Sequence, residues 1–336
     1  MDKKFDLVGI GNAIVDVLAY KDQKFLSEHG LTKGAMTLVD ETEVKKLYHL
    51  MGTATECSGG STANTLAGFA MLGGESAFIG KVKDDQLGEI FKKDMERIGV
   101  NFVTNMATSG TPTACCIIFV TEEEGKFGMG PKVERTMATY LGASISIGEN
   151  DVNEEIIKAA KTLFFEGYLW DSPTARKAIQ KAISIAKEND IKIAFTLSDP
   201  LCVGRHKEEF EKLVDNDIDI LFANEHEIEA LYSENDIRKV LYRVKGKCEI
   251  VAITRSEKGS YILSEGDIYT INPEKVRDVY DVTGAGDLYA SGFLYGWLNG
   301  LGPEKSGKLG SHCAAEVIKY LGGRPVTKLS DLLKKL

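Results

Sequence analysis

The stretch that decides the fold contains three apolar segments, Thr162-Leu163-Phe164-Phe165-Glu166, Ile191-Lys192-Ile193-Ala194-Phe195-Thr196-Leu197 and Ile218-Asp219-Ile220-Leu221-Phe222-Ala223. Each has the composition of a buried strand, and each follows a segment with the pattern of a helix, at residues 153–161, 174–187 and 208–213. Strands that alternate with helices predict an α/β fold with a mostly parallel sheet and right-handed crossovers. Ligands bind such sheets beyond the carboxyl ends of the strands, where the sequence has Gly11, Gly167, Asp199 and Asn224.

The N-terminal part of the chain extends this sheet. Residues 5–10 have the pattern of a buried strand. A dinucleotide-binding turn would need a third glycine at Ile14 and a helix after it, whereas β-branched residues continue the chain there as a second strand. Asp16 interrupts this apolar run. It either binds ligand hydroxyls or lies on a solvent-facing side, because burial of an unpartnered carboxylate is costly.

Residues 100–142 depart from the alternation of strands and helices. Apolar runs at 113–120 and 137–141 alternate with polar loops, and Glu122-Glu123-Glu124-Gly125 has the pattern of a hairpin tip. We expect a single domain over residues 1–336, with a small β-sheet lid formed by insertions at about 13–40 and 101–142. Arg135, in the second insertion, either clamps a phosphate or lies in solvent.

Two glycine-rich turns lead into helices. In Cys57-Ser58-Gly59-Gly60-Ser61-Thr62-Ala63-Asn64, the paired glycines would let a ligand approach the backbone, and Asn64 could donate to and accept from a sugar hydroxyl. In Asp281-Val282-Thr283-Gly284-Ala285-Gly286-Asp287, the free N–H groups and the dipole of the following helix would form an anion site. A carboxylate at Asp287 suits phosphoryl transfer to an acceptor whose proton it removes. A tight turn before a packed helix, capped by an acid in the second case, is the structural alternative for each.

Asn224-Glu225-His226-Glu227 has two interpretations. Asn at a helix start with Glu three positions later is a capping box, which by itself explains both residues. In a functional role, Glu227 would hold magnesium through water at the strand-end face.

The composition excludes several classes of protein. The chain has 336 residues, 43% of them hydrophobic, and a net charge of −9, which disfavours nucleic-acid binding. The six cysteines form no C-x-x-C pair, so we expect reduced thiols rather than zinc or a disulfide framework. We see no signal peptide and no stretch long enough to span a membrane, and therefore expect a cytoplasmic protein.

Together these motifs resemble the ribokinase-like carbohydrate kinase family, which includes ribokinase, fructokinase and adenosine kinase. The resemblance covers nearly the whole chain. Residues 281–287 are similar to the family's D-T-x-G-A-G-D signature, with Val282 in place of the usual Thr. The resemblance implies a three-layer α/β/α fold and phosphorylation of an alcohol with ATP and magnesium.

The resemblance also implies site residues. Asp287 would be the catalytic base, Gly284, Ala285 and Gly286 the anion hole, and Arg135 would reach the phosphates as the lid closes. Substrate contacts are implied for Asn12, Ile14, Asp16, Gly59, Gly60, Ser61, Asn64, Met137, Leu141 and Leu169. ATP contacts are implied for Asn224, Thr254, Gly259, Gly284, Gly286 and His312. Glu227 would bind magnesium through water, and Asp281 and Thr283 are the candidates for a potassium site.

Within the family, residues 11–16, 59–64 and 135–143 resemble the adenosine kinase branch. By that resemblance an apolar pocket holds a base, formed by Ile14, Met36, Leu38, Cys116, Met137, Thr139 and Leu141. Leu169 stands where adenosine kinases commonly stack an aromatic ring on the base. We therefore expect adenosine as the acceptor, phosphorylated at its 5′-OH in purine salvage.

Other functions stay open at this point. The nearest rival is a sugar kinase acting on ribose, fructose or a keto-sugar acid, and the next is a non-catalytic ligand sensor on the same fold. A dehydrogenase is disfavoured by Ile14. We expect a small-molecule nucleoside or sugar as the partner, and a monomer or a homodimer, because the lid in this family can be a cover or a dimer interface.

Overall fold

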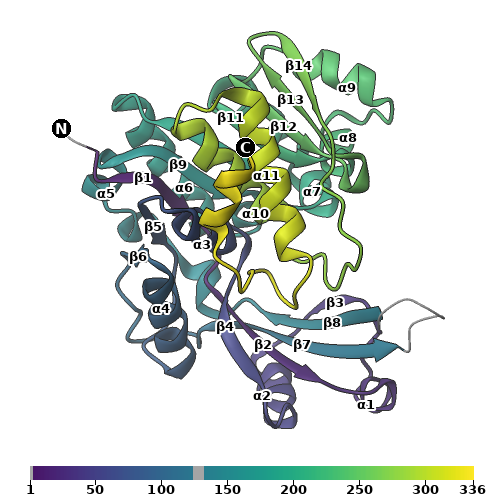
Figure 1. Ribbon diagram of the computed structural model, residues 1–336. Helices are drawn as coiled ribbons and strands as arrows, with labels where there is room; N and C mark the ends of the chain where they lie inside the picture. The colour runs from purple at the N-terminus through teal and green to yellow at the C-terminus, as the bar shows by residue number, and fades with distance from the viewer. Residues whose placement is uncertain (1–2, 124–131) are drawn as a thin grey trace.

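The computed structural model of the protein describes residues 3–123 and 132–336, and two sheets organise them (Figure 1). The expected hairpin tip at Glu122–Gly125 lies partly outside these residues, since the description stops at Glu123. The large sheet has the strand order β14-β13-β12-β11-β10-β9-β1-β5-β6. All of its pairs are parallel except β12–β13 and β13–β14. The mostly parallel α/β sheet expected from the sequence is therefore confirmed.

The strands of the large sheet are β1 (Phe5–Ile10), β5 (Ser76–Ile79), β6 (Val100–Phe102), β9 (Ala160–Glu166), β10 (Lys192–Thr196), β11 (Ile220–Asn224), β12 (Ile250–Thr254), β13 (Ser260–Ser264) and β14 (Asp267–Ile271). The helices around it are α3 (Ser61–Leu72), α4 (Gln86–Ile98), α5 (Glu154–Lys158), α6 (Pro173–Glu188), α7 (Pro200–Asn216), α8 (Glu225–Tyr232), α9 (Ile237–Val244), α10 (Ala285–Leu298) and α11 (Gly302–Val317).

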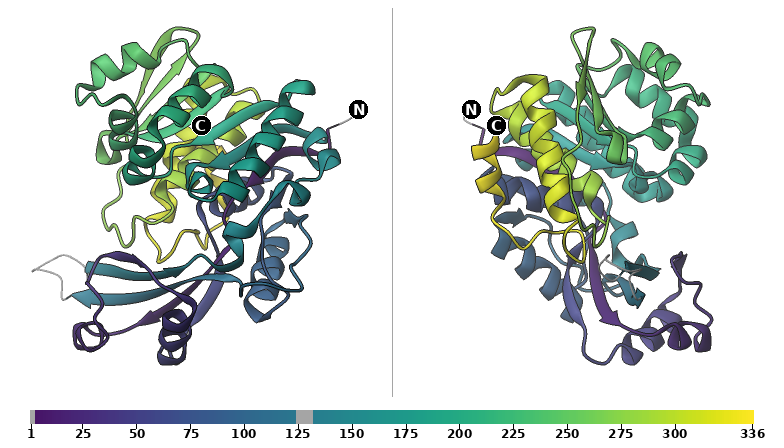
Figure 2. Two further views of the ribbon diagram at one scale, coloured as in Figure 1. Left: turned by 180° about the vertical axis from the view of Figure 1, so that it is seen from behind. Right: turned by 45° about the vertical axis from the view of Figure 1, so that its right-hand side comes forward.

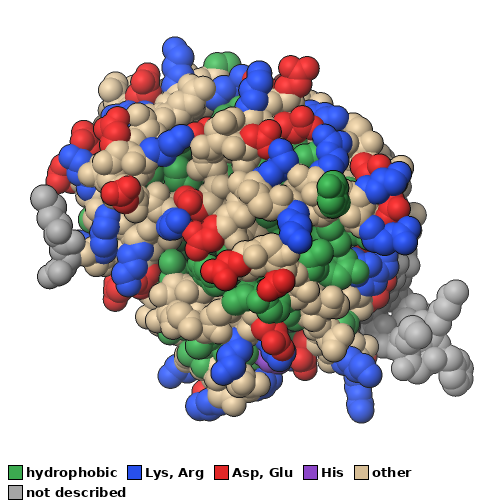
Figure 3. Space-filling view, turned by 90° about the horizontal axis from the view of Figure 1, so that it is seen from above, with side chains coloured by type: hydrophobic (Ala, Val, Ile, Leu, Met, Phe, Trp, Pro, Cys, Tyr) green, Lys and Arg blue, Asp and Glu red, His purple; other side chains and the backbone are tan. Residues whose placement is uncertain are grey.

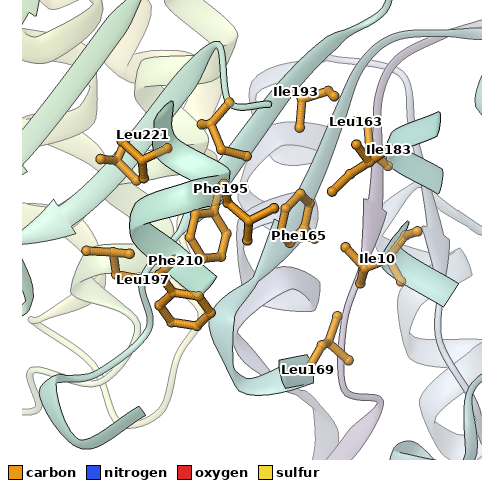
Figure 4. Packing of buried hydrophobic residues seen from close by; sticks show 14 of the residues in the cluster. Ile10, Leu163, Phe165, Leu169, Ile183, Ile193, Phe195, Leu197, Phe210 and Leu221 are labelled. Carbon is orange, nitrogen blue, oxygen red and sulfur yellow. The ribbon is translucent and has the colours of Figure 1, made fainter. Parts of the chain in front are cut away.

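Successive strand residues supply two separate cores, because side chains alternate between the faces of a strand. Leu163 and Phe165 of β9 belong to a cluster with residues of α6, α7 and α8. Phe164, between them, belongs to a second cluster with residues of α3 and α10. Figure 4 shows the first cluster, in which Phe165, Phe195 and Phe210 pack side by side. Helices thus cover both faces of the sheet in three layers, as expected.

The small sheet projects from the body of the molecule (Figure 2). Its strands are β2 (Ile14–Tyr20), β3 (Met36–Leu38), β4 (Thr55–Gly59), β7 (Ala114–Glu123) and β8 (Lys132–Tyr140), in the order β3-β8-β7-β2-β4. The short helix α1 (Gln23–Glu28) and α2 (Glu41–Leu50) connect strands of this sheet. Two strands differ from the expected composition of the lid. β4 comes from a stretch that we did not predict as a strand, and Val100–Phe102 joins the large sheet instead.

The surface carries charges of both signs, as the composition implies. Positive and negative side chains are interspersed over the face shown in Figure 3. Among residues 3–123 and 132–336, no helix has both the length and the apolarity that a bilayer crossing requires. All six cysteines are free thiols, and four of them are buried.

Candidate active site

The site is centred on the N-terminus of α10. Its N-cap, Gly284, has a φ of +74°, and a Cβ there would lie 2.7 Å from Gly323, so a glycine is needed on both grounds. Ala285, Gly286 and Asp287 form the first turn. The N–H of Ala285 donates to the carbonyl of Val282 at 3.2 Å, whereas the N–H groups of Gly286 and Asp287 have no hydrogen-bond partner among the described residues. These two groups lie at the positive end of the helix dipole and can bind an anion.

Asp287 is held by two side chains of α3. Ser61 Oγ donates to Asp287 Oδ1 at 2.7 Å, and Asn64 Nδ2 donates to Oδ2 at 3.0 Å. Burial raises the pKa of Asp287 to about 6, while these hydrogen bonds and the charge of Arg324 act in the opposite direction. A carboxyl with this pKa is ionised at neutral pH and can still accept a proton readily, as a general base must.

Asp16 lies on β2 opposite the glycine pair. A Cβ at Gly59 would lie 2.6 Å from the Asp16 carboxyl group, and one at Gly60, whose φ is +94°, would lie 2.3 Å from the carbonyl oxygen of Asn12. The glycines therefore make room for the acid and for the turn into α3. Burial raises the pKa of Asp16 to about 6, opposed by Arg135 and Arg324.

Glu166, at the carboxyl end of β9, was not among the residues expected here. Its Oε1 accepts from the backbone N–H and the side-chain amide of Asn12, at 3.1 and 3.0 Å, and its Oε2 accepts from the N–H of Thr62 at 2.8 Å. It is 1% exposed, and burial raises its pKa. Glu166 thus ties the β1–β2 turn to the start of α3, and Asn12 is occupied by this contact. The strand-end rule already marked the neighbouring Gly167, so the signal was available.

Arg135 reaches from β8 to the loop before α10. Its Nη1 lies 3.2 Å from Asp281 Oδ2 and also contacts the Thr283 hydroxyl, and both charged side chains are nearly inaccessible to solvent. Asp281 also accepts from the backbone N–H groups of Thr283 and Gly322, at 3.0 and 2.8 Å. The potassium expectation therefore fits poorly, because a guanidinium already neutralises the Asp281 carboxylate.

Asn224 and Glu227 form the capping box at the start of α8. Asn224 Oδ1 accepts from the N–H of Glu227 at 2.9 Å, and Glu227 Oε2 accepts from the N–H of Asn224 at 2.8 Å. Burial raises the pKa of Glu227 to about 7. Both side chains also line a small cavity of about 80 Å³ together with Asp287 and Gly286. The cap and a place beside the reacting groups are thus compatible, and the polar cavity fits a magnesium ion that keeps most of its waters.

A second cavity, of about 500 Å³, extends outward from there. It is lined by several of the expected ATP-binding residues, Asn224, Thr254, Gly259 and Gly286. Gly259 has a φ of +83°, and a Cβ there would lie 2.0 Å from the carbonyl oxygen of Ile271. His312 is not among the lining residues. Its Nδ1 lies 3.2 Å from Glu274 Oε2, and Glu274 does line the cavity.

The expected base-binding residues separate into two groups. Ile14 and Met137 lie with Leu18, Cys116 and Ile118 in an apolar cluster on one face of the small sheet, which we call the inner face. Met36 and Leu38 pair in register with Met137 and Thr139, and their side chains are 55% and 60% exposed. Leu141, just after β8, is half-buried.

Leu169 belongs elsewhere. The turn Gly167–Asp171 folds this side chain into the core beside α6, where it is 1% exposed (Figure 4). The structure therefore does not bring Leu169 to the inner face. The sequence did not predict this position of Leu169, because an apolar residue after a strand suits a pocket and a core equally well.

A third cavity, of about 760 Å³, is separate from the two described above and has Asp16 in its wall. Asp16, Asn64 and Arg324 line it, and the rest of its wall comes from β2, β4, α4 and residues 321–326. Arg324 was not among the residues expected at the site. Its carboxylate contact, Asp94 on α4, lies at 3.3 Å, and both side chains are 13% exposed.

Comparison with known proteins agrees with this geometry. Residues 34–328 match the pfkB family carbohydrate kinases. A curated protein of Halalkalibacterium halodurans, named 5-dehydro-2-deoxygluconokinase, is 30% identical over 329 residues, which cover 94% of this chain and 89% of that protein.

Two solved structures are more similar still. A probable sugar kinase from Rhizobium etli is 44% identical with a TM-score of 0.89, and covers 99% of this chain and 98% of its own. The adenosine kinase from Sinorhizobium meliloti is 44% identical with a TM-score of 0.88, and covers 99% of both chains. The chain therefore belongs to the pfkB family of carbohydrate kinases, and it is a ribokinase-like phosphotransferase with an alcohol acceptor.

Proposed function

We propose that the protein is an ATP-dependent sugar kinase, which phosphorylates a primary hydroxyl group of a sugar or of a sugar-containing molecule. The observation that carries this proposal is the half-buried Asp287 carboxylate at the start of α10, with unpaired helix N–H groups beside it and two donors holding it. A base and an anion site on one helix turn are what transfer of a phosphoryl group to an alcohol requires.

The proposed roles follow from position. Asp287 accepts the proton of the acceptor hydroxyl as its oxygen attacks, and the unpaired N–H groups at the start of α10, that of Gly286 among them, stabilise negative charge on the group being transferred. Asp16 and Asn64, which line the same cavity, hold the other hydroxyls of the sugar. The carboxylate of Asp16 accepts hydrogen bonds, while the amide of Asn64 can donate.

ATP supplies the phosphoryl group, and magnesium is the usual ion of kinases in this family. Thr254, Gly259 and Asn224 line the cavity that would hold the nucleotide, and Glu227 would hold the ion through water. Among the described residues, no cluster of three or more His, Cys, Asp or Glu side chains could bind a metal alone. This supports an ion held mainly by phosphates and water.

We further propose that the small sheet, with its parts from residues 14–59 and 114–140, acts as a lid over the acceptor. Its inner face carries the apolar side chains around Ile14 and Met137, and Arg135 already connects it to the loop before α10. A lid that closes on both substrates excludes water and so limits hydrolysis of ATP.

The identity of the acceptor is the finer part of the proposal. The curated relatives support a free sugar: the protein of Halalkalibacterium halodurans is named for 5-dehydro-2-deoxygluconate, a keto-sugar acid, and the structure from Rhizobium etli is titled a probable sugar kinase. The adenosine acceptor and the purine-salvage role expected from the sequence are not confirmed by these names. A free sugar or sugar acid is therefore our first candidate.

Adenosine is the second candidate, and two observations favour it. Met36 and Leu38 expose apolar surface at the edge of the inner face, which a bare sugar does not need. Of the two cationic side chains that act on Asp16, Arg324 is fully hydrogen-bonded and Arg135 is paired with Asp281 and expected at the phosphates, so neither is assigned to a substrate carboxylate. The 44% identity to an adenosine kinase points the same way.

A panel of acceptors tests the proposal. The protein is incubated with ATP and magnesium, with and without potassium, and with adenosine, other nucleosides, ribose, fructose and keto-sugar acids, and ADP release is measured. A free sugar or sugar acid turned over fastest supports the first candidate, and adenosine turned over fastest supports the second. No turnover with any acceptor would support a non-catalytic sensor and contradict the proposed function.

A further inference from the structure

Arg324 reaches the candidate active site from the far end of the chain. It follows Gly322-Gly323 after α11, yet its guanidinium contacts residues of β4, α3 and α4. Nε donates to Asn64 Oδ1 at 3.2 Å, and Nη1 donates to Ser58 Oγ at 2.5 Å and to Asp94 Oδ2 at 3.3 Å. The contact with Asn64 is the one that concerns the reaction, because Asn64 itself touches Asp287.

A guanidinium can donate hydrogen bonds but cannot accept them. The atom of Asn64 that faces Arg324 must therefore be the carbonyl oxygen Oδ1, and the NH₂ group must face the other way. It then donates to Asp287 Oδ2 at 3.0 Å. The orientation of an asparagine amide is often ambiguous, but here the donor-only partner on one side and the carboxylate on the other select the same one.

The backbone around Arg324 is packed tightly enough to hold it there. A Cβ at Gly323 would lie 2.6 Å from Asn64 Nδ2, and the N–H of Gly322 donates to Asp281 Oδ2 at 2.8 Å. Asp94 balances the charge of the arginine, and Ser58 also donates its hydroxyl and its N–H to Asp94. The guanidinium is thus fixed by neighbours that do not depend on Asn64.

We propose that Arg324 is a positioning residue of the kinase: it fixes the amide of Asn64 so that Asn64 donates to the carboxylate of Asp287. This rests on the proposed function, in which Asp287 is the base. Without Arg324, the amide can rotate and direct Oδ1 at Asp287, and two acceptors in contact favour the protonated carboxyl group. A protonated Asp287 cannot remove the proton of the acceptor.

The other charges near Asp287 define what the test must exclude. Arg324 lowers the pKa of Asp287 by its charge as well as through Asn64. Asp16 on β2, Glu166 on β9 and Glu227 on α8 are carboxylates that interact with Asp287 across the site. A variant that keeps the positive charge but lacks the planar guanidinium separates the effect of the Asn64 orientation from the effect of the charge.

Arg324→Lys is that variant, and Arg324→Met is its neutral counterpart. The acidic limb of the profile of kcat/KM against pH is measured for both. Since a hydrogen bond to a charged group contributes about one pKa unit or more, we expect the limb to move up by about one pH unit in Arg324→Lys, and further in Arg324→Met, which also loses the charge. Arg238→Gln is the control, because Arg238 pairs with Asp236 at 3.1 Å and lines none of the three cavities of the site. It should leave the limb in place.

A double-mutant cycle with Asn64→Ala completes the test. If Arg324 acts through Asn64, Arg324→Lys should not move the limb further once Asn64 is absent. A limb that stays at the parent pH in Arg324→Lys, or that moves equally with and without Asn64, overturns the proposal and leaves only the charge.

Titration of the ¹³C-labelled carboxyl carbon of Asp287 by NMR gives the same answer without turnover, with Asp287→Asn identifying the signal. It should titrate about one pH unit higher in Arg324→Lys than in the parent, and the same midpoint in both proteins overturns the proposal. If no acceptor is phosphorylated, the proposed function fails while this titration still decides the role of Arg324.

Discussion

Two buried arginines approach the candidate active site from opposite regions, and they are held differently. Arg135 comes from the projecting small sheet and contacts Asp281 and Thr283 through Nη1, while its Nε has no hydrogen-bond partner among the described residues. Arg324 comes from the segment after α11, and all three of its guanidinium nitrogens have partners. Arg135 therefore keeps one unsatisfied donor, whereas Arg324 has none.

This difference teaches how one site can combine a moving part with a fixed part. An arginine with an unsatisfied nitrogen gains by meeting a phosphate, since a guanidinium can form bidentate hydrogen bonds with phosphate oxygens. A fully bonded arginine gains nothing by moving and instead holds its neighbours in place. We therefore expect Arg135 to act on the transferred group and Arg324 to act on the residues around the base.

The largest effect is expected from substitution of Asp287, the proposed base. Asp287→Asn removes the proton acceptor and should lower kcat by about 10² to 10⁴, the range for a general base. In the parent, kcat/KM should fall below a pH of about 6, because the pKa of Asp287 is about 6 and the protonated form cannot accept a proton. Steady-state rates across pH measure both effects. A variant that keeps the parent rate would contradict the mechanism.

Arg135→Met should come next, with kcat lowered by about 10² to 10³, as when a charge-stabilising donor is lost. The KM for the acceptor should change little, because Arg135 is expected at the phosphates. Its matched variant is Arg243→Met, which removes an arginine that donates to the carbonyl of Tyr232, far along the sequence from the site. Equal losses of kcat in Arg135→Met and Arg243→Met would show a general effect on folding. They would contradict the proposed difference between Arg135 and Arg324.

Asp16→Asn tests the electrostatic cost of the site. The pKa of Asp16 is raised from 3.8 to about 6 by burial, although both arginines oppose the rise. Between these two pKa values the folded state binds more protons than the unfolded state, so the stability contributed by this group falls as pH rises through 6. The neutral variant should therefore raise the free energy of unfolding at pH 8 by on the order of 1 to 3 kcal/mol. Urea unfolding at pH 8 and pH 5 measures this, and an equal gain at both pH values would exclude the explanation.

Gly323→Ala should give the smallest effect, a loss of about tenfold in kcat/KM, since a close contact that must shift costs about 1 kcal/mol. The new methyl group would press on Asn64 Nδ2 from 2.6 Å. Gly148→Ala is the control, because a Cβ there meets nothing within 4 Å. Parent-like kcat/KM in Gly323→Ala would mean that the position of Asn64 is less restricted than the contact with Arg324 suggests.

The sequence predicted the framework of the molecule well. Strand β1 spans the expected residues 5–10, and β9 ends at the expected residue, Glu166. These successes share a cause: hydrophobic periodicity and helix caps act over a few residues and can be seen in one segment. The capping box at Asn224 was predicted for the same reason, and the structure forms it.

The parts that were missed depend on residues far apart in the chain. Glu166 is explained by Asn12 and Thr62, and Arg324 by Asn64 and Asp94, at separations of 104 to 260 residues. Nothing local distinguishes Arg324 from an ordinary surface arginine, and the local signal for Glu166 was its place at the end of a strand. The prediction for Leu169 was wrong for a different reason. Its side chain is apolar and suits both a pocket and the core, and the conformation of the turn that contains it places it in the core.

The position of β1 has a consequence for the order in which the chain can fold. Leu7 on this strand pairs with Ser76 on one side and with Thr162 on the other, so β1 is synthesised before either partner and has to wait for both. Such distant pairings slow folding, and they leave an apolar strand exposed while the chain grows. During synthesis, the N-terminal segment is therefore where we expect chaperones to be needed most.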